Sequence, residues 1–308
     1  MANSKDVVVT GVSTGIGWGT TKVLISKGFR VFGSVRKQSD GDRLQKEFGD
    51  GFVPLLMDVT DADAVGEAAR KVGSMTGDRN LVGLVNNAGV VVSGPLLYLR
   101  PSEYRRQLDV NMIAPLVVIQ AFASLLGTDK KRQGPAGRIV NVSSSGAKVA
   151  IPLLGAYSAS KFGLEGMSDA LRRELMLFGI DVVIIEPGTV NTAMYDKGEK
   201  EDLSEFKPTA YWEAVQKFQK FIVTEARTNG LSPERLGEAV HVALSTAKPK
   251  VRYAVIPQRF KNWILPRLLP ARMVDAQLAK MLGLTKPSRP GTAGLTSHDE
   301  GKPRIVGA

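Results

Sequence analysis

The stretch that decides the fold runs from Asp6 to Gly19 and reads DVVVTGVSTGIGWG. It joins a short apolar run to a segment with four glycines in ten residues, and a helix-like pattern follows. Glycine permits a tight turn and lets another group approach the backbone closely. The spacing Gly11-x-x-x-Gly15-x-Gly17 therefore fits a loop that binds a phosphate at a helix N-terminus. A purely structural turn is the alternative.

Short apolar, β-branched runs recur along the chain, and helix-like segments separate most of them. Unbroken apolar strands that alternate with helices predict a parallel sheet covered on both faces. We therefore expect an α/β fold with a doubly wound parallel sheet, the Rossmann fold. The strands are expected at 6–10, 30–35, 52–57, 81–85, 138–142, 181–186 and 252–256.

The same pattern predicts the organisation of the 308 residues. Residues 1–257 are expected to form one domain, in which 193–230 is a polar and aromatic helical insertion. Residues 258–284 read as a helical extension. Residues 285–308, rich in Gly, Pro, Ser and Thr, read as a disordered tail.

Composition limits the function classes. The net charge is +11, but the positive residues are scattered and no nucleic-acid-binding signature accompanies them, so we expect no nucleic acid as partner. The chain has no cysteine, which excludes disulfides and thiolate chemistry. Its two histidines, His241 and His298, lie far apart, and we expect no metal site. The N-terminus lacks a signal-peptide pattern and no run of about 18 apolar residues occurs, so we expect a cytoplasmic protein without a membrane span.

Further motifs follow the glycine loop in one order. They are Asp58, NNAG at 86–89, Asn111, Ser144, the pair Tyr157-x-x-x-Lys161 and Pro187-Gly188. This series resembles the short-chain dehydrogenase/reductase family over residues 5–192, and more loosely to about 256. FGSVRK, LVGLVNNAGV and YSASKFGLEGMSDALRREL are most similar to its hydroxysteroid and retinol dehydrogenase branch.

The residues themselves support acid–base chemistry. Tyr157 and Lys161 are four apart in a helical pattern, so their side chains share one face. A nearby ammonium stabilises the phenolate and brings the tyrosine pKa toward the working range. The alternative is that Lys161 pairs with Glu165, which is also four residues away, while Tyr157 only packs.

The resemblance implies a role for each of these residues. Tyr157 would be the general acid or base, and Lys161 would also hold the nicotinamide ribose. Ser144, 13 residues before Tyr157, would hydrogen-bond the substrate oxygen, with Ser143 and Ser145 as rival candidates. Asn111 would position a water beside the lysine, or be structural only.

The resemblance also implies the cofactor-binding set. Asp58 would lie at the adenine, although it or Asp61 could instead cap the next helix. Val190 would hold the carboxamide through its backbone and Thr192 through its hydroxyl. The full set is Gly11, Ser13, Thr14, Gly15, Ile16, Gly17, Arg36, Asp58, Val59, Asn87, Ala88, Gly89, Tyr157, Lys161, Pro187, Gly188, Val190 and Thr192.

The end of the second strand predicts the cofactor. NAD-specific members place an acid there, whereas this chain has Val35 followed by Arg36 and Lys37. An arginine binds a 2′-phosphate with two hydrogen bonds, and a carboxylate would repel it. We therefore expect NADP(H), with a solvated basic turn as the alternative interpretation of these residues.

The leading functional hypothesis is an oxidoreductase that interconverts a carbonyl and a secondary alcohol on a lipophilic small molecule. A 3-ketoacyl reductase is the alternative enzyme, although such relatives end near 245–250 residues with a glycine-rich close that this chain lacks. A catalytically idle NADP-binding scaffold is the alternative of another class, although such proteins usually lose the tyrosine or the lysine.

Two interaction surfaces are expected. Residues 101–126 and 157–178 predict long helices that relatives pack against a partner, so we expect a homodimer or homotetramer. Residues 259–284 mix large apolar side chains with cations, and Pro266 and Pro270 interrupt the helix. This segment fits a lid over the cleft or a contact with the partner subunit. A peripheral contact with an anionic membrane is the alternative.

Overall fold

The computed structural model describes residues 5–192 and 202–285. Its centre is a seven-stranded sheet in which every pair of neighbours is parallel. The strand order is β3-β2-β1-β4-β5-β6-β7. The bounds are β1 Lys5–Val9, β2 Phe29–Val35, β3 Phe52–Leu56, β4 Gly83–Asn86, β5 Arg138–Val142, β6 Asp181–Pro187 and β7 Arg252–Val255. The predicted doubly wound sheet is confirmed.

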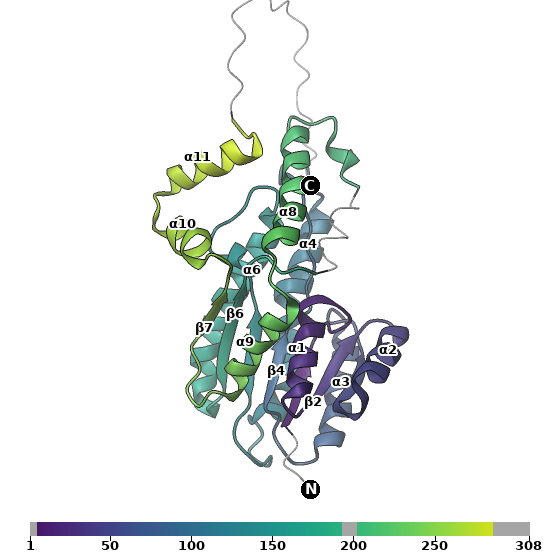
Figure 1. Cartoon of the computed structure of the whole chain (residues 1–308). Helices are drawn as coiled ribbons and strands as arrows, with labels where there is room; N and C mark the ends of the chain where they lie inside the picture. Colours follow the sequence, from purple (N-terminus) through teal and green to yellow (C-terminus); the bar gives the residue numbers. More distant parts are fainter. Residues whose placement is uncertain (1–4, 193–201, 286–308) are drawn as a thin grey trace, which may run out of the picture.

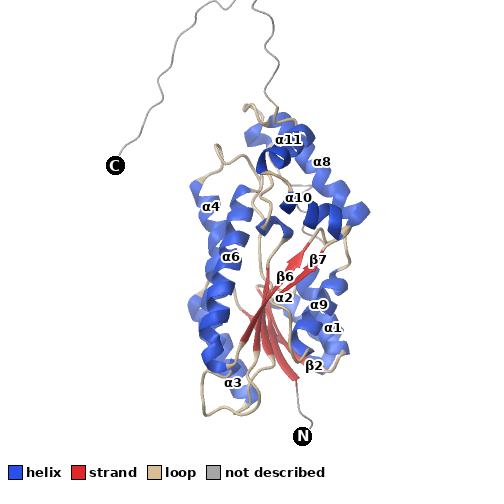
Figure 2. Cartoon of the chain, turned by 90° about the vertical axis from the view of Figure 1, so that its left-hand side faces the viewer, coloured by secondary structure: helices blue, strands red, loops and turns tan. Residues whose placement is uncertain are grey.

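Helices cover both faces of the sheet, which explains why its strands are almost continuously apolar. Seen edge-on, the sheet separates α3, α4 and α6 on one side from α1 and α9 on the other (Figure 2). The bounds are α1 Gly15–Ser26, α2 Gln38–Phe48, α3 Ala62–Thr76, α4 Pro101–Leu108, α5 Ala114–Phe122, α6 Gly155–Glu174, α8 Trp212–Asn229 and α9 Pro233–Ser245. Two separate apolar clusters fill the two interfaces between helices and sheet.

The order of the strands determines where a ligand can bind. The chain runs outward from β1 to β2 and β3, and then crosses back to β4 on the other side of β1. The loops after β1 and β4 therefore diverge at the carboxyl edge of the sheet, where doubly wound folds bind their ligands. The glycine loop and the NNAG segment are these two loops.

A third apolar cluster lies beyond that edge, and we call it the roof. It contains Leu153 and Leu154 from the segment before α6, Phe206 and Phe218 from the insertion, and Leu282 from the C-terminal extension. The extension folds into two short helices, α10 Leu265–Leu268 and α11 Ala271–Leu282, and α11 contacts α8 (Figure 1). Within the insertion and tail, residues 193–201 and 286–308 are outside the described residues.

One helical run, Pro101–Leu126, is by length and composition alone apolar enough to cross a membrane, with a mean hydropathy of 1.7 in an 18-residue window. It includes α4, a π-helical turn at Asp109–Ile113, and α5. Its buried residues, among them Val118 and Phe122, pack in the cluster that joins α3 and α5 to the sheet. A helix packed in the core of a globular protein passes the same test of length and composition.

Candidate active site

The glycine loop has the geometry of a phosphate cradle. Gly11 and Gly15 have φ of +68° and +61°, in the left-handed region that favours glycine. A Cβ on Gly17 would lie 2.2 Å from the Gly11 carbonyl oxygen, so the first turn of α1 touches the loop directly. Thr14 precedes α1 but makes no side-chain cap hydrogen bond, and the first turn holds no acidic residue. The backbone N–H groups there are oriented for an anion.

The neighbours of this loop are arranged around it. Ser13 and Ile16 are partly buried, and Ile16 packs on the apolar cluster beneath α1. The Gly11 N–H donates to Ser34 Oγ of β2 at 2.8 Å. Arg43 of α2 donates to the Ser13 carbonyl oxygen at 2.6 Å. Sequence reasoning missed Arg43, because nothing in its spacing indicates that α2 reaches back to the loop.

The ends of β1 and β4 are joined by hydrogen bonds. Asn87 Nδ2 donates to the carbonyl oxygens of Thr10 and Gly11 at 2.9 and 3.0 Å. The Thr10 hydroxyl accepts from the N–H groups of Asn87 and Ala88. Asn87 therefore fixes the path of the glycine loop, while Ala88 and Gly89 continue along the carboxyl edge as expected.

The 2′-phosphate position proposed from the sequence lies at the end of β2. Arg36 and Lys37 are exposed there, and Val35 is buried. Asp58 Oδ1 accepts hydrogen bonds from the N–H and hydroxyl of Thr60. Burial by itself would raise the pKa of Asp58. The hydrogen bonds from Thr60 and the charge of Arg36 together outweigh burial, so the pKa lies below its ordinary value. Asp61, and not Asp58, caps α3, and Val59 is buried.

The loop after β6 lies against the glycine loop. Pro187 is the last residue of β6, and the Gly188 N–H donates to the Val255 carbonyl oxygen at 2.9 Å. Val190 is buried and bridges to Leu231. A Cβ on Gly15 would lie 3.3 Å from Cγ2 of Thr192, so the loop predicted to bind a phosphate meets the segment predicted to bind the carboxamide.

Asn111 lies in the π-helical turn Asp109–Ile113, where it is 1% exposed. Its Oδ1 accepts from the Val90 N–H, and its Nδ2 donates to the Val90 carbonyl oxygen and to Ser160 Oγ. Gln107, one turn earlier, likewise holds the N–H of Val92 and the carbonyl oxygen of Val90. Asn111 thus joins the loop after β4 to helix α6. The signal that sequence reasoning missed is the i, i+4 spacing of Gln107 and Asn111.

Lys161 is buried beneath Tyr157. Its ammonium donates to the Val142 carbonyl oxygen at 2.8 Å and lies 5.9 Å from the centre of the Tyr157 ring. Burial lowers the pKa of Lys161 to about 8. The Tyr157 side chain is partly buried. The two side chains share the face of α6 that the spacing predicted.

Ser144 lies next to Tyr157. A Cβ on Gly146 would be 3.4 Å from Ser144 Oγ and 3.5 Å from Tyr157 Cε1, so both side chains flank this glycine. Ser144 Oγ accepts from the Gly146 N–H at 3.0 Å. Ser143, the rival candidate, is 3% exposed and donates instead to Glu165. Sequence reasoning missed Gly146, which leaves the space between serine and tyrosine open.

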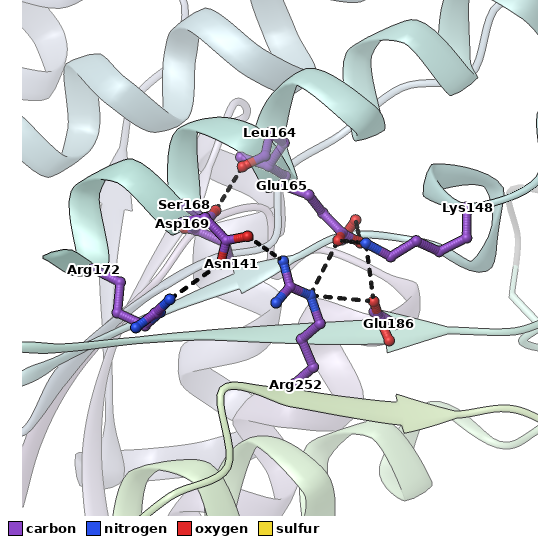
Figure 3. A network of polar contacts seen from close by, with 10 residues as sticks. Asn141, Lys148, Leu164, Glu165, Ser168, Asp169, Arg172, Glu186 and Arg252 are labelled. Carbon is purple, nitrogen blue, oxygen red and sulfur yellow. Dashed lines mark hydrogen bonds and ion pairs between the residues drawn. The ribbon is translucent and has the colours of Figure 1, made fainter.

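The alternative interpretation, in which Lys161 pairs with Glu165, is wrong. Glu165 pairs with Lys148 and with Arg252, whose Nε lies 3.2 Å from it (Figure 3). Glu186 at the end of β6 lies beside the same two cations. Lys161 is therefore not neutralised by the neighbouring carboxylate, and its charge remains for Tyr157. No group of three or more potential metal ligands occurs in residues 5–192 and 202–285.

A doubly wound sheet with a glycine loop at the switch point and a Ser–Tyr–Lys–Asn set at its carboxyl edge defines an NAD(P)-binding oxidoreductase. The short chain dehydrogenase family model matches residues 5–203. The chain belongs to this family, in the branch of the steroid and retinol dehydrogenases.

Individual relatives cover nearly the whole chain. The NADPH-dependent 3-dehydrocapnine reductase of Ornithobacterium rhinotracheale is 38% identical over 87% of this chain and 94% of its own. The 17-beta-hydroxysteroid dehydrogenase type 6 of Mus musculus is 34% identical over 89% of this chain and 88% of its own.

Solved structures share the fold. A metagenomic short-chain oxidoreductase in complex with NADP is 26% identical, with a TM-score of 0.63, over 83% of this chain and 98% of its own. A Burkholderia phymatum short-chain dehydrogenase/reductase in complex with NAD is 18% identical, with a TM-score of 0.73, over 94% of this chain and 98% of its own.

Proposed function

We propose that this protein is an NADP(H)-dependent oxidoreductase that interconverts a carbonyl and a secondary alcohol on a lipophilic small molecule. The observation that carries the proposal is the placement of Ser144 and Tyr157 on either side of Gly146, with the Lys161 ammonium buried beneath the tyrosine. This arrangement places a hydroxyl and a phenol on either side of one glycine, with a cation beside the phenol, which are the groups that general acid–base catalysis on a substrate oxygen needs.

Each residue has a defined part in this proposal. Ser144 donates a hydrogen bond to the substrate oxygen. Tyr157 gives its proton to that oxygen during reduction and removes it during oxidation, and Lys161 stabilises the phenolate. Asn111 holds the segment after β4 against α6, and in this proposal it positions a water beside Lys161. The nicotinamide, when bound, supplies or accepts the hydride.

Three observations support NADP(H) as the cofactor. Arg36 and Lys37 are exposed where an acid would otherwise contact the ribose. The relative at 38% identity is named an NADPH-dependent enzyme. A solved structure at 26% identity contains NADP, although another family member, at 18% identity, contains NAD.

A lipophilic substrate is favoured by the roof. Its apolar side chains come from three segments next to the site, and one of these, Ile151–Leu154, immediately precedes α6 and Tyr157. The steroid and retinol names of relatives agree with this substrate class. A 3-ketoacyl reductase is the second candidate. The roof, to which the extension contributes Leu282 and Leu284, favours the lipophilic small molecule.

The extension is assigned a lid role in this proposal. Leu282 is fully buried among roof residues, and Leu284 packs beside it. Contact with an anionic membrane remains the second role, favoured by exposed Phe260, Leu268 and Met273 next to exposed Arg267 and Arg272. We further propose a cytoplasmic homodimer, for which exposed Ile113 and Phe162 on the two long helices are candidate contacts.

The experiment that tests the function is consumption of NADPH by the purified protein with a panel of lipophilic and small polar carbonyls. We expect turnover of lipophilic ketones. Tyr157→Phe removes one hydroxyl and should lower kcat by about 10²–10⁴-fold, because general acid catalysis is lost. NADPH binding should be retained, as followed by fluorescence.

Two results would contradict the proposal. If wild-type protein binds NADPH but reduces no member of the panel, the protein is an idle scaffold. If Tyr157→Phe keeps more than a few per cent of kcat, another group is the proton donor.

A further inference from the structure

Two buried carboxylates and two partly exposed cations form a cluster where α6 faces β6 and β7, and we call it the carboxylate cluster (Figure 3). It consists of Glu165 of α6, Glu186 of β6, Arg252 of β7, and Lys148 of the segment that follows Ser144. The side chains of Glu165 and Glu186 are 5% and 2% exposed. Burying a charged side chain costs free energy unless it is paired, so two buried carboxylates are expected to have a structural or functional role.

Each member comes from a segment that also carries a proposed site residue, except Arg252, which links the others. Glu165 lies one helical turn after Lys161. Glu186 immediately precedes Pro187 and Gly188. The cluster therefore joins the helix of the lysine to the loop predicted to bind the nicotinamide end of the cofactor.

The serine segment is the third connection. Ser143 Oγ donates to Glu165 Oε1 at 3.1 Å, and Lys148 donates to the Oε2 atom of the same carboxylate. Ser144 lies between these two contacts, and its hydroxyl orientation depends on the Gly146 N–H within the same segment. One carboxylate thus holds residues 143–148 at both ends.

The cations lie closer to Glu165 than to Glu186. Glu186 Oε1 is 3.9 Å from the Lys148 ammonium and 3.7 Å from Arg252 Nε, whereas Glu165 Oε2 is 3.2 Å from that Nε and accepts the hydrogen bond of Lys148. Burial, and then the nearby Glu165 carboxylate, raise the pKa of Glu186. Arg252 Nη2 meanwhile pairs with Asp169 at 2.8 Å. The ion pairs of the cluster are therefore centred on Glu165, the residue that holds the serine segment.

We propose that Glu165 is a positioning residue for the reaction. Together with Lys148 it fixes residues 143–148 so that the hydroxyls of Ser144 and Tyr157 can both hydrogen-bond the same substrate oxygen. This inference rests on the proposed function for its kinetic consequence. Its structural consequence, the order of residues 143–148, is independent of any activity.

The test compares Glu165→Gln with Asp169→Asn. The glutamine retains an oxygen that accepts from Ser143 but loses the charge that holds Lys148. Asp169 lies one turn further along α6 and pairs with Arg252. Within the described residues it forms no hydrogen bond or ion pair with residues 143–148, so Asp169→Asn is the matched control. Lys148→Ala and the double variant with Glu165→Gln complete a cycle that isolates the pair.

Two measurements are made on each variant. The first is steady-state kinetics with a lipophilic ketone. Glu165→Gln should lower kcat/KM for the ketone roughly tenfold, less than the roughly 10²–10³-fold loss on removing a transition-state donor, because Ser144 is displaced and not removed. The KM for NADPH should stay within about twofold, since the glycine loop is untouched. The second is hydrogen exchange, in which the amides of 143–150 should exchange faster in Glu165→Gln and not in Asp169→Asn.

The outcomes separate this inference from the proposed function. If no carbonyl is reduced by wild-type protein, the function fails, and faster exchange at 143–150 still supports the positioning role. Unchanged exchange and unchanged kcat/KM in Glu165→Gln overturn it. Losses that appear equally in ketone kinetics, NADPH binding and melting temperature also overturn it, because they report general destabilisation. Additive effects of Glu165→Gln and Lys148→Ala overturn the pairing.

Discussion

Lys161 illustrates, at the scale of single residues, a side chain placed where its own charge is unfavourable. Its amine is buried, and burial lowers its pKa to about 8 from an ordinary value of 10.5. The folded protein therefore binds its proton less tightly than the unfolded chain does. The resulting penalty is fully present below pH 8 and disappears as pH rises through 10.5. In the proposed mechanism this cost in stability is offset by function, because the Lys161 cation stabilises the Tyr157 phenolate.

Lys161→Met should therefore stabilise the protein while it abolishes turnover. At pH 7 we expect the free energy of unfolding to increase by about 1–2 kcal/mol, less than the full pKa shift implies because the hydrogen bond to Val142 is lost. Urea unfolding at pH 7 and at pH 10 measures this. The advantage of the variant should shrink at the higher pH, and an advantage that grows there would contradict the assignment.

Arg36 is the residue on which the choice of NADPH over NADH depends in the proposed function. Arg36→Ala should weaken NADPH binding by about 1.5–3 kcal/mol, the contribution of a charge-assisted hydrogen bond, and leave NADH binding nearly unchanged. Dissociation constants for both cofactors are measured by fluorescence. Arg70→Ala, which removes an exposed cation on α3, is the control. Equal losses for the two cofactors would remove Arg36 from the 2′-phosphate site.

At the scale of elements, the contact of α1 with the glycine loop leaves no room for a side chain. A Cβ on Gly17 would lie 2.2 Å from the Gly11 carbonyl oxygen and 2.5 Å from Asn87 Nδ2. Neither atom can move without changing the loop, since Asn87 also fixes the Gly11 carbonyl. Close packing of helix and strand here is a requirement of the cofactor site and not only of the fold.

Gly17→Ala should abolish cofactor binding and lower stability by more than 1 kcal/mol, because the inserted methyl overlaps backbone atoms. Gly66→Ala is the control, since a Cβ there meets only Arg70 Nη1, at 3.5 Å. That variant, in the interior of α3, should gain about 0.5–1 kcal/mol from helix propensity. Calorimetry and NADPH titration of both variants measure the difference. If Gly17→Ala bound NADPH as the wild type does, the glycine loop would have moved to make room for the methyl group, and the prediction would be wrong.

At the scale of the whole molecule, the roof joins the C-terminal extension to the insertion and to the segment before α6. Leu282 is fully buried there, whereas Leu268, in the same extension, is 74% exposed. The two leucines therefore allow the two proposed roles of the extension to be tested separately. Burial of Leu282 fits a lid, and exposure of Leu268 beside cations fits a surface contact.

Leu282→Ala should release the end of α11 from the roof and lower kcat/KM for a lipophilic ketone severalfold, with small carbonyls unaffected. The lost packing is of order 2–5 kcal/mol, enough to undock a short helix. Leu268→Ala should leave these kinetics unchanged but reduce binding to anionic vesicles at low salt. Unchanged kinetics in Leu282→Ala would reject the lid, and absence of vesicle binding by the wild type would reject the membrane contact.

The sequence by itself determined the architecture and supplied the candidate residues of the site. The seven apolar runs predicted the seven strands within one or two residues at each end, because buried parallel strands must be apolar on both faces. The glycine spacing located the cradle, since only glycine adopts those φ values without cost. Tyr157 and Lys161 were predictable because both lie on one helix, where spacing fixes which side chains share a face.

The tertiary structure decided everything that joins segments distant in the chain. It showed that Glu165 pairs with Lys148 and Arg252 and not with Lys161, that Gly146 separates Ser144 from Tyr157, and that Arg43 reaches the glycine loop. It also showed that the apolar run 101–126 packs on the core and that Leu282 joins the roof. The physical reason is that the spacing of residues along a segment determines only which of its own side chains share a face. The partner of a buried charge or an apolar face is set by which segments the fold brings together.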